Sequence, residues 1–136
     1  RRKRSQPLTG LRVLCIDNEP KILEGMALLI TGWGCTVREA QSITALDEIT
    51  RSGEPAPDII IADYHLDDGD GIAAIQSLRA AYEADVPALL ITADRSADVR
   101  NEAEKHGISL QHKPVRPAAL RAYLTQIAGL RRLAAE

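Results

Sequence analysis

Five short apolar segments alternate along the chain with five stretches in which apolar residues recur every three or four positions. The apolar segments span residues 11–16, 35–37, 59–62, 88–92 and 108–112, and the helical patterns span residues 20–31, 42–51, 71–82, 96–106 and 117–132. Short apolar runs are typical of buried strands, and the longer spacing is typical of amphipathic helices. Strict alternation of the two predicts an α/β fold, a parallel sheet covered by helices on both faces.

The composition is that of an ordinary globular domain. Of the 136 residues, 45% are hydrophobic and 26% are charged, with a net charge of -2 and no run long enough to span a membrane. We therefore expect one domain with no direct contact to nucleic acid or membrane. Cys15 and Cys35 lie in apolar runs without metal-ligand spacing. They are expected to be reduced core thiols of a cytoplasmic protein.

The first residues differ from the rest, because four cations precede Pro7 and no initiating Met is present. We expect the chain to be a piece of a longer protein. The predicted organisation is a basic linker or tail at residues 1–10, one domain at 11–132 and a C-terminal tail at 133–136.

Polar residues stand at the ends of four predicted strands. Asp17 and Asn18 follow the first, Asp63 the third and Lys113 the fifth, and Thr92 ends the fourth. Ligands of open parallel sheets bind at these carboxyl ends, and the strand order 2-1-3-4-5 brings Asp17 beside Asp63. Two carboxylates about 4 Å apart repel by about 4 kcal/mol at an effective dielectric near 20, so they favour Mg²⁺ and a lysine nearby. These groups predict a site that stabilises a phosphoryl group.

The motifs at these strand ends resemble the receiver domain of bacterial two-component response regulators. They are Asp17-Asn18-Glu19-Pro20, Asp63 with Gly69-Asp70-Gly71, Thr92-Ala93 and Lys113-Pro114, and the resemblance covers about residues 11–130. It implies a flavodoxin-like (βα)5 sandwich with a parallel five-stranded sheet in the order 2-1-3-4-5.

The resemblance also implies a role for each site residue. Asp63 would accept a phosphoryl group from phosphohistidine, the Thr92 hydroxyl would turn toward the phosphoryl oxygens, and Lys113 would pair with Asp63 ahead of a cis proline. Mg²⁺ or Mn²⁺ would be held by Asp17, Asn18, Asp63 and the backbone carbonyl of His65. Such a domain is a switch that catalyses its own phosphoryl transfer and dephosphorylation.

Two positions depart from the family pattern. Asn18 stands where the family usually has a second aspartate, so Mg²⁺ is expected to bind more weakly unless Glu19 compensates. Leu110 stands where the family has an aromatic switch residue, three positions before the lysine. The signal is then expected to pass through Thr92 and the loop that follows it.

The other acidic residues of the segment after Asp63 are expected to be structural. Asp67 and Asp68 are interpreted as solvated loop residues, and Asp70 as the N-cap of the third helix. The His65 side chain is expected to face solvent, with tuning of acyl phosphate hydrolysis as the alternative.

Three functions fit the residues. The first is a phosphorylatable receiver in a phosphorelay, partnered by a histidine kinase core or a histidine phosphotransfer domain. The second is an aspartyl-phosphate hydrolase, which would need an acidic residue two positions after Asp63. His65 stands at that position and counts against this function. The third is a pseudo-receiver that binds partners without phosphorylation, suggested by Asn18 and Leu110. A homodimer through the fourth helix, fifth strand and fifth helix is a further expectation.

Three short sequence segments indicate the kind of protein to which this domain belongs. LCIDNEPKILEGM, GWGC and HKPVRPAAL resemble receivers at the C-terminus of hybrid sensor histidine kinases, whose parent chain can be membrane-attached. A stand-alone response regulator is the alternative.

Overall fold

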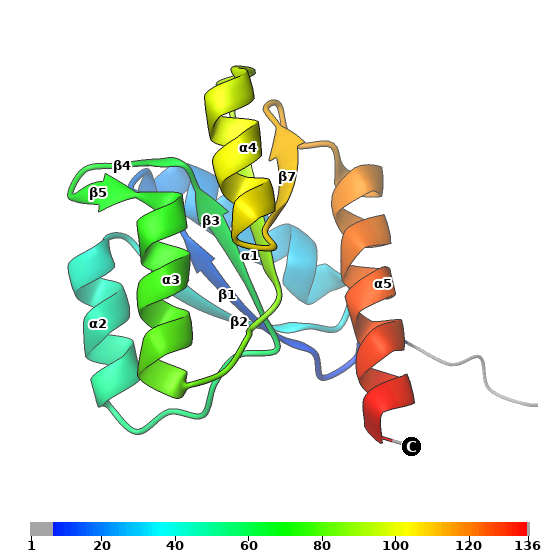
Figure 1. Ribbon diagram of the computed structural model, residues 1–136. Coiled ribbons are helices and arrows are strands. Elements are labelled where there is room, and N and C mark those ends of the chain that lie inside the picture. The colour runs from blue at the N-terminus through cyan, green and yellow to red at the C-terminus, as the bar shows by residue number, and fades with distance from the viewer. Residues whose placement is uncertain (1–6, 136) are drawn as a thin grey trace, which may run out of the picture.

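The computed structural model describes residues 7–135, so the predicted basic segment at residues 1–6 lies outside the described part of the chain. Its elements are β1 (Arg12–Ile16), α1 (Pro20–Gly32), β2 (Thr36–Ala40), α2 (Ile43–Arg51), β3 (Ile59–Asp63), β4 (His65–Leu66), β5 (Gly69–Asp70), α3 (Gly71–Tyr82), β6 (Ala88–Thr92), α4 (Ala97–Lys105), β7 (Ser109–His112) and α5 (Pro117–Ala135). Five parallel strands form one sheet in the order β2-β1-β3-β6-β7, and β4 and β5 form a separate small hairpin (Figure 1). The predicted flavodoxin-like fold and strand order are confirmed.

The sheet is buried on both faces at its centre. All five residues of β3 and all five of β6 are buried. Alternate side chains point to opposite layers, so Ile60 packs with α2, α3 and α4 while Ile61 packs with α1 and α5. Burial on both faces explains why these strands read as continuous apolar runs in the sequence. Cys15 and Cys35 are free and buried, as predicted.

Helix starts are specified locally by side chains that satisfy the first backbone amides. Ser42 accepts a hydrogen bond from Ala45 N at the start of α2, and Asp70 accepts one from Ala73 N at the start of α3. Pro20 is the first residue of α1, where a missing N–H costs nothing. The predicted N-cap role of Asp70 is confirmed.

Three boundaries differ from the sequence prediction. The second strand spans Thr36–Ala40 rather than residues 35–37. It is an edge strand and tolerates exposed polar residues, so its sequence lacks the apolar run by which a buried strand is predicted. The last helix continues to Ala135 instead of ending at 132, and its final turns are exposed, so no apolar spacing marks their end. Leu8, in the predicted linker, is only 3% exposed and packs into the core beside α1 and α5.

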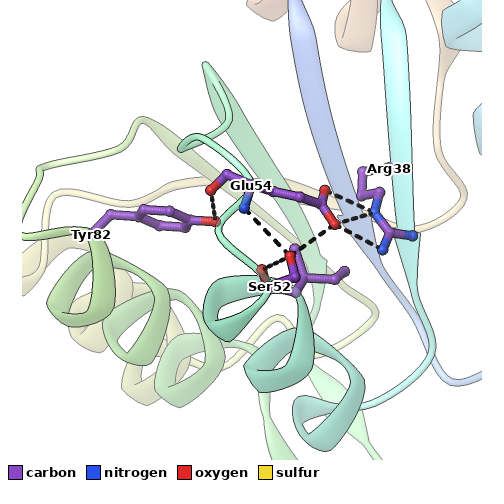
Figure 2. A network of polar contacts seen from close by, with 5 residues as sticks. Arg38, Ser52, Glu54 and Tyr82 are labelled. Carbon is purple, nitrogen blue, oxygen red and sulfur yellow. Dashed lines mark hydrogen bonds and ion pairs between the residues drawn. The ribbon is translucent and has the colours of Figure 1, made fainter.

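The edge strand β2 is tied to the loop that leads into β3. Figure 2 shows Glu54 of that loop between Arg38 of β2 and Ser52 at the end of α2. Arg38 Nε and one terminal nitrogen each donate to the Glu54 carboxylate at 3.0 Å, and the Tyr82 hydroxyl donates to the Glu54 carbonyl at 3.0 Å.

Within residues 7–135, no helix has the length and apolar character needed to cross a bilayer.

Candidate functional site

An acidic pair begins the site at the carboxyl end of β1. The Asp17 side chain is buried, Asn18 is half-buried, and Asp17 N donates to Ala40 O of β2 at 3.1 Å. Burial raises the pKa of Asp17, the hydrogen bond from Glu19 N to its Oδ1 at 2.9 Å lowers it, and the nearby Asp63 charge raises it again. The net effect is a raised pKa, so an ionised Asp17 is costly until a cation approaches.

Asp63 ends the central strand β3 and is paired with a lysine from another strand end. Lys113 Nζ lies 2.6 Å from Asp63 Oδ1, and Asp63 is 6% exposed. Burial lowers the pKa of Lys113, but the hydrogen bond and the charge of Asp63 outweigh this effect and raise it above its usual 10.5. Lys113 is therefore charged at neutral pH and holds one oxygen of the Asp63 carboxylate.

Thr92 completes the site from β6, on the side of β3 opposite β1. Asp63 pairs in register with Ile91, so Thr92 stands one residue further along the neighbouring strand. Its side chain is 1% exposed, and its hydroxyl oxygen accepts a hydrogen bond from Asp94 N at 2.9 Å. The Thr92 carbonyl accepts from Lys113 N at 2.9 Å, and the Lys113–Pro114 peptide bond is cis, as the resemblance implied.

The sheet thus brings together the four side chains that the sequence placed at strand ends, Asp17, Asp63, Thr92 and Lys113. In residues 7–135 no three His, Cys, Asp or Glu side chains gather closely enough to hold a metal ion. The second acidic position is Asn18, so two carboxylates remain. Magnesium in proteins commonly takes one or two carboxylates with carbonyl oxygens and water. Asp63 pairs with Lys113, and Asp17 interacts with both through its charge, so two carboxylates lie together, a donor chemistry that fits Mg²⁺.

The segment after Asp63 forms the hairpin of β4 and β5. The His65 side chain is exposed as predicted, with its ring edge-on to Tyr64 at 4.8 Å between centroids. Asp67 is exposed in the turn. Asp68 is exposed in the same turn, as predicted, and its carboxylate also accepts hydrogen bonds from Ile43 N at 3.1 Å and Thr44 N at 3.2 Å, a contact that was not predicted.

These bonds lower the pKa of Asp68, with the bond from Ile43 as the largest cause. Its partners stand 25 and 24 residues away in the sequence. No local sequence pattern could have revealed the contact.

Comparison with known proteins gives relatives that include two-component response regulators. The chain is 32% identical over 116 residues to "Two-component response regulator ARR2" of Arabidopsis thaliana, covering 82% of this chain and 17% of that protein. It is 30% identical over 95 residues to "Transcriptional regulatory protein ZraR" of Salmonella typhimurium, covering 70% of this chain and 21% of that protein. The chain spans less than a quarter of either relative.

Solved structures show the same fold. A response regulator receiver domain protein from Clostridium thermocellum superposes with a TM-score of 0.80 at 22% identity, covering 90% of this chain and 98% of that one. A CheY-like receiver domain protein from Methanospirillum hungatei has a TM-score of 0.81 at 18% identity, covering 93% and 99%. The sequence pattern of the family described as "Response regulator receiver domain" matches residues 13–125, more than half of the chain. The chain belongs to the response regulator receiver domain family of two-component signalling.

Proposed function

We propose that this domain is phosphorylated on Asp63. A carboxylate oxygen of Asp63 attacks the phosphorus of a phosphohistidine, the O–P bond forms as the P–N bond breaks, and the electron pair leaves with the imidazole. The donor is the histidine of a kinase core or of a histidine phosphotransfer domain. The observation that carries this proposal is the 2.6 Å contact between Lys113 Nζ and the buried Asp63 carboxylate.

The neighbouring side chains support this chemistry through fixed charge and hydrogen bonds. Lys113 provides a positive charge beside the reacting carboxylate, where it also stabilises charge that develops on the phosphoryl oxygens. The Thr92 oxygen accepts a bond from Asp94 N, which leaves its proton to donate to a phosphoryl oxygen. One such bond to a charged group is worth about 1.5 to 3 kcal/mol, which shifts a two-state equilibrium roughly 10- to 150-fold.

Asp17, Asn18, Asp63 and the backbone carbonyl of His65 would hold Mg²⁺, or Mn²⁺ in its place. The cation supplies charge neutralisation of the phosphoryl oxygens. Asp17 provides a buried carboxylate, whose pKa is raised first by burial and also by the charge of Asp63. Asn18 offers only its amide oxygen, so this chain's site carries one negative charge fewer than the family pattern.

Intact mass measurement after incubation with acetyl phosphate and Mg²⁺ tests the proposal. We expect wild type to gain one phosphoryl group, Asp63→Asn to gain none, and Asp67→Asn to behave as wild type, because Asp67 is exposed in the hairpin turn. No gain on wild type, or a gain that survives in Asp63→Asn, would refute phosphorylation at this residue.

A pseudo-receiver that binds partners without phosphorylation is the second candidate. It is favoured by Asn18, which leaves the site one carboxylate short of the family pattern. Leu110, half-buried against the α2, α3 and α4 layer, offers no hydroxylated ring for switching. The same mass measurement separates the two candidates, since a pseudo-receiver gains no phosphoryl group at any Mg²⁺ concentration.

We propose that this domain is the C-terminal, cytoplasmic receiver of a hybrid sensor histidine kinase. This proposal rests only on the resemblance of the three short sequence segments quoted above. The Arabidopsis relative is described as a two-component response regulator and the Salmonella relative as a transcriptional regulatory protein, which supports the response regulator alternative. Reading the coding sequence on both sides of this segment decides between them, because a hybrid kinase carries a histidine-bearing helical domain and an ATP-binding domain upstream. A homodimer through α4, β7 and α5 is proposed because β7 is an edge strand.

A further inference from the structure

The hairpin of β4 and β5 is attached at its tip to the start of α2. The Asp68 carboxylate accepts from Ile43 N at 3.1 Å, from Thr44 N at 3.2 Å and from Thr44 Oγ1 at 3.2 Å. Ile43 and Thr44 are the first two residues of α2, whose amides have no partner within the helix. Asp68 thus places a negative charge at the positive end of α2.

The hairpin also packs closely against α2. A Cβ atom at Gly69 would lie 2.6 Å from Ile43 Cδ1, and Gly69 has φ +153, a conformation that disfavours side chains. Leu66 is buried within the core layer that contains α2. The tip of the hairpin therefore packs tightly against the start of α2, and Asp68 provides the polar contacts between the two.

The base of the hairpin is attached to α3 and to the site. Tyr64 O accepts from Gly71 N at 2.8 Å, and Asp70 caps α3 through Ala73 N at 2.8 Å. His65 pairs in register with Asp70 across the two short strands. His65 lies two residues after Asp63, so its backbone is held between an anchored base and an anchored tip.

We infer that Asp68 is a positioning residue of the magnesium site, because its anchor on α2 fixes the hairpin that presents the backbone carbonyl of His65. The inference rests on the proposed function for the role of that carbonyl. Residues that orient metal ligands commonly change metal affinity 10- to 100-fold when they are lost. The coupling is reciprocal, so Mg²⁺ binding must also strengthen the contact between Asp68 and α2.

The adjacent aspartate offers a matched control. Asp67 is one residue away, carries the same charge and is exposed in the same turn. Asp67→Ala and Asp68→Ala remove equal charge from the hairpin, while only the second removes the bonds to Ile43 and Thr44. Asp68→Asn retains an oxygen that can accept from Ile43 N, so it is expected to recover part of the effect.

Three measurements on the whole chain test the inference. The first is the carbonyl ¹³C shift of His65 in the metal-free protein, which we expect to move in Asp68→Ala and to stay in Asp67→Ala. The second is the Mg²⁺ dissociation constant, expected to rise about 10-fold in Asp68→Ala, less in Asp68→Asn and little in Asp67→Ala. The third is hydrogen exchange at the Ile43 and Thr44 amides, which Mg²⁺ should slow in wild type and leave unchanged in Asp68→Ala.

The outcomes separate a positioning role from a purely structural one. If Asp68→Ala lowers stability but leaves the His65 shift and the Mg²⁺ affinity at wild-type values, Asp68 is only a cap for α2 and the inference is overturned. Equal losses of affinity in Asp67→Ala and Asp68→Ala also overturn it, because they would reflect general charge. If wild type takes no phosphoryl group while both readouts depend on Asp68, the proposed function fails and the positioning role stands.

Discussion

Lys113 Nζ lies 2.6 Å from Asp63 Oδ1 although the two residues belong to strand ends that are not neighbours in the sheet. β6 lies between β3 and β7, so the lysine side chain reaches across the end of β6, beside Thr92. The contact ties three strand ends together at one carboxylate. It also couples the protonation of the site to the stability of the fold.

Replacing Lys113 tests that coupling through pH. The pKa of Lys113 is raised in the folded state above its ordinary 10.5. The ion pair therefore stabilises the fold fully below pH 10.5, and this stabilisation is lost as the pH rises through the folded pKa. Denaturant unfolding of wild type and Lys113→Met should differ by a constant amount from pH 7 to about 10 and converge above it. A difference that grows at alkaline pH would contradict this sign.

The ionised Asp17 carboxylate is expected to lower the stability of the metal-free fold and to contribute to cation binding. Its pKa is raised, first by burial, so the folded state binds the proton more tightly than the unfolded state. Stability then falls as the pH rises from the unfolded value of 3.8 through the folded pKa. Asp17→Asn removes this cost, and its amide oxygen can still accept the bond from Glu19 N. Without Mg²⁺ at pH 7, the variant should melt at a higher temperature than wild type.

The same variant should lose the benefit of Mg²⁺. Ligand binding to the folded state raises the melting temperature of wild type, and a site with one carboxylate gains less. Thermal unfolding with and without Mg²⁺ measures both effects. A variant that melts below wild type in the absence of metal would show that ionised Asp17 stabilises the fold.

Asn18 provides the reverse experiment. Asn18→Asp adds a third carboxylate beside Asp17 and Asp63, and affinity for hard cations rises with the number of charged ligands. We expect Mg²⁺ to bind about 10-fold more tightly, equivalent to about 1.4 kcal/mol. The metal-free variant should be less stable than wild type, because the added charge faces two like charges. Calorimetric titration gives the affinity, and Asp67→Asn serves as the control for a remote change of one charge.

Most of the site was predictable because parallel strands end at a common edge of the sheet. Asp17, Asp63, Thr92 and Lys113 each follow or end an apolar run, and the strand order alone places them together. Local signals also sufficed for Pro20 at the start of α1, which is the first helical residue as expected.

The hairpin after Asp63 was not predictable from the sequence. β4 and β5 contain two residues each, too few to show any alternation of apolar and polar positions. Asp68 finds its partners on α2 only because the fold places α2 beside α3. Asp67 and Asp68 are both exposed in the turn, and among the bonds described only Asp68 reaches Ile43 and Thr44, so the difference between the two arises from tertiary structure.

Gly71 joins the hairpin to α3 where the backbone has no room for a side chain. A Cβ atom there would strike the carbonyl oxygen of Asp63 and lie 2.8 Å from Leu90 Cδ1. Gly71→Ala must displace the backbone of Asp63 or the start of α3, and overpacking of this kind costs about 1 to 3 kcal/mol. Gly25→Ala in α1 is the matched control, because nothing lies within 4 Å of its Cβ position. Alanine in an exposed helix is expected to stabilise the fold by roughly 0.5 to 1 kcal/mol.

Urea unfolding measures the change in the free energy of unfolding for each glycine variant, which we expect to be a loss in Gly71→Ala and a gain in Gly25→Ala. Intact mass after acetyl phosphate treatment then shows whether the displaced Asp63 backbone slows phosphoryl gain in Gly71→Ala, with Gly25→Ala at the wild-type rate. Equal stability changes in the two variants would mean that the Asp63 carbonyl can move away from α3 without cost. In that case the backbone at Asp63 would be held by the Lys113 ion pair and the β3 pairing rather than by its contact with Gly71.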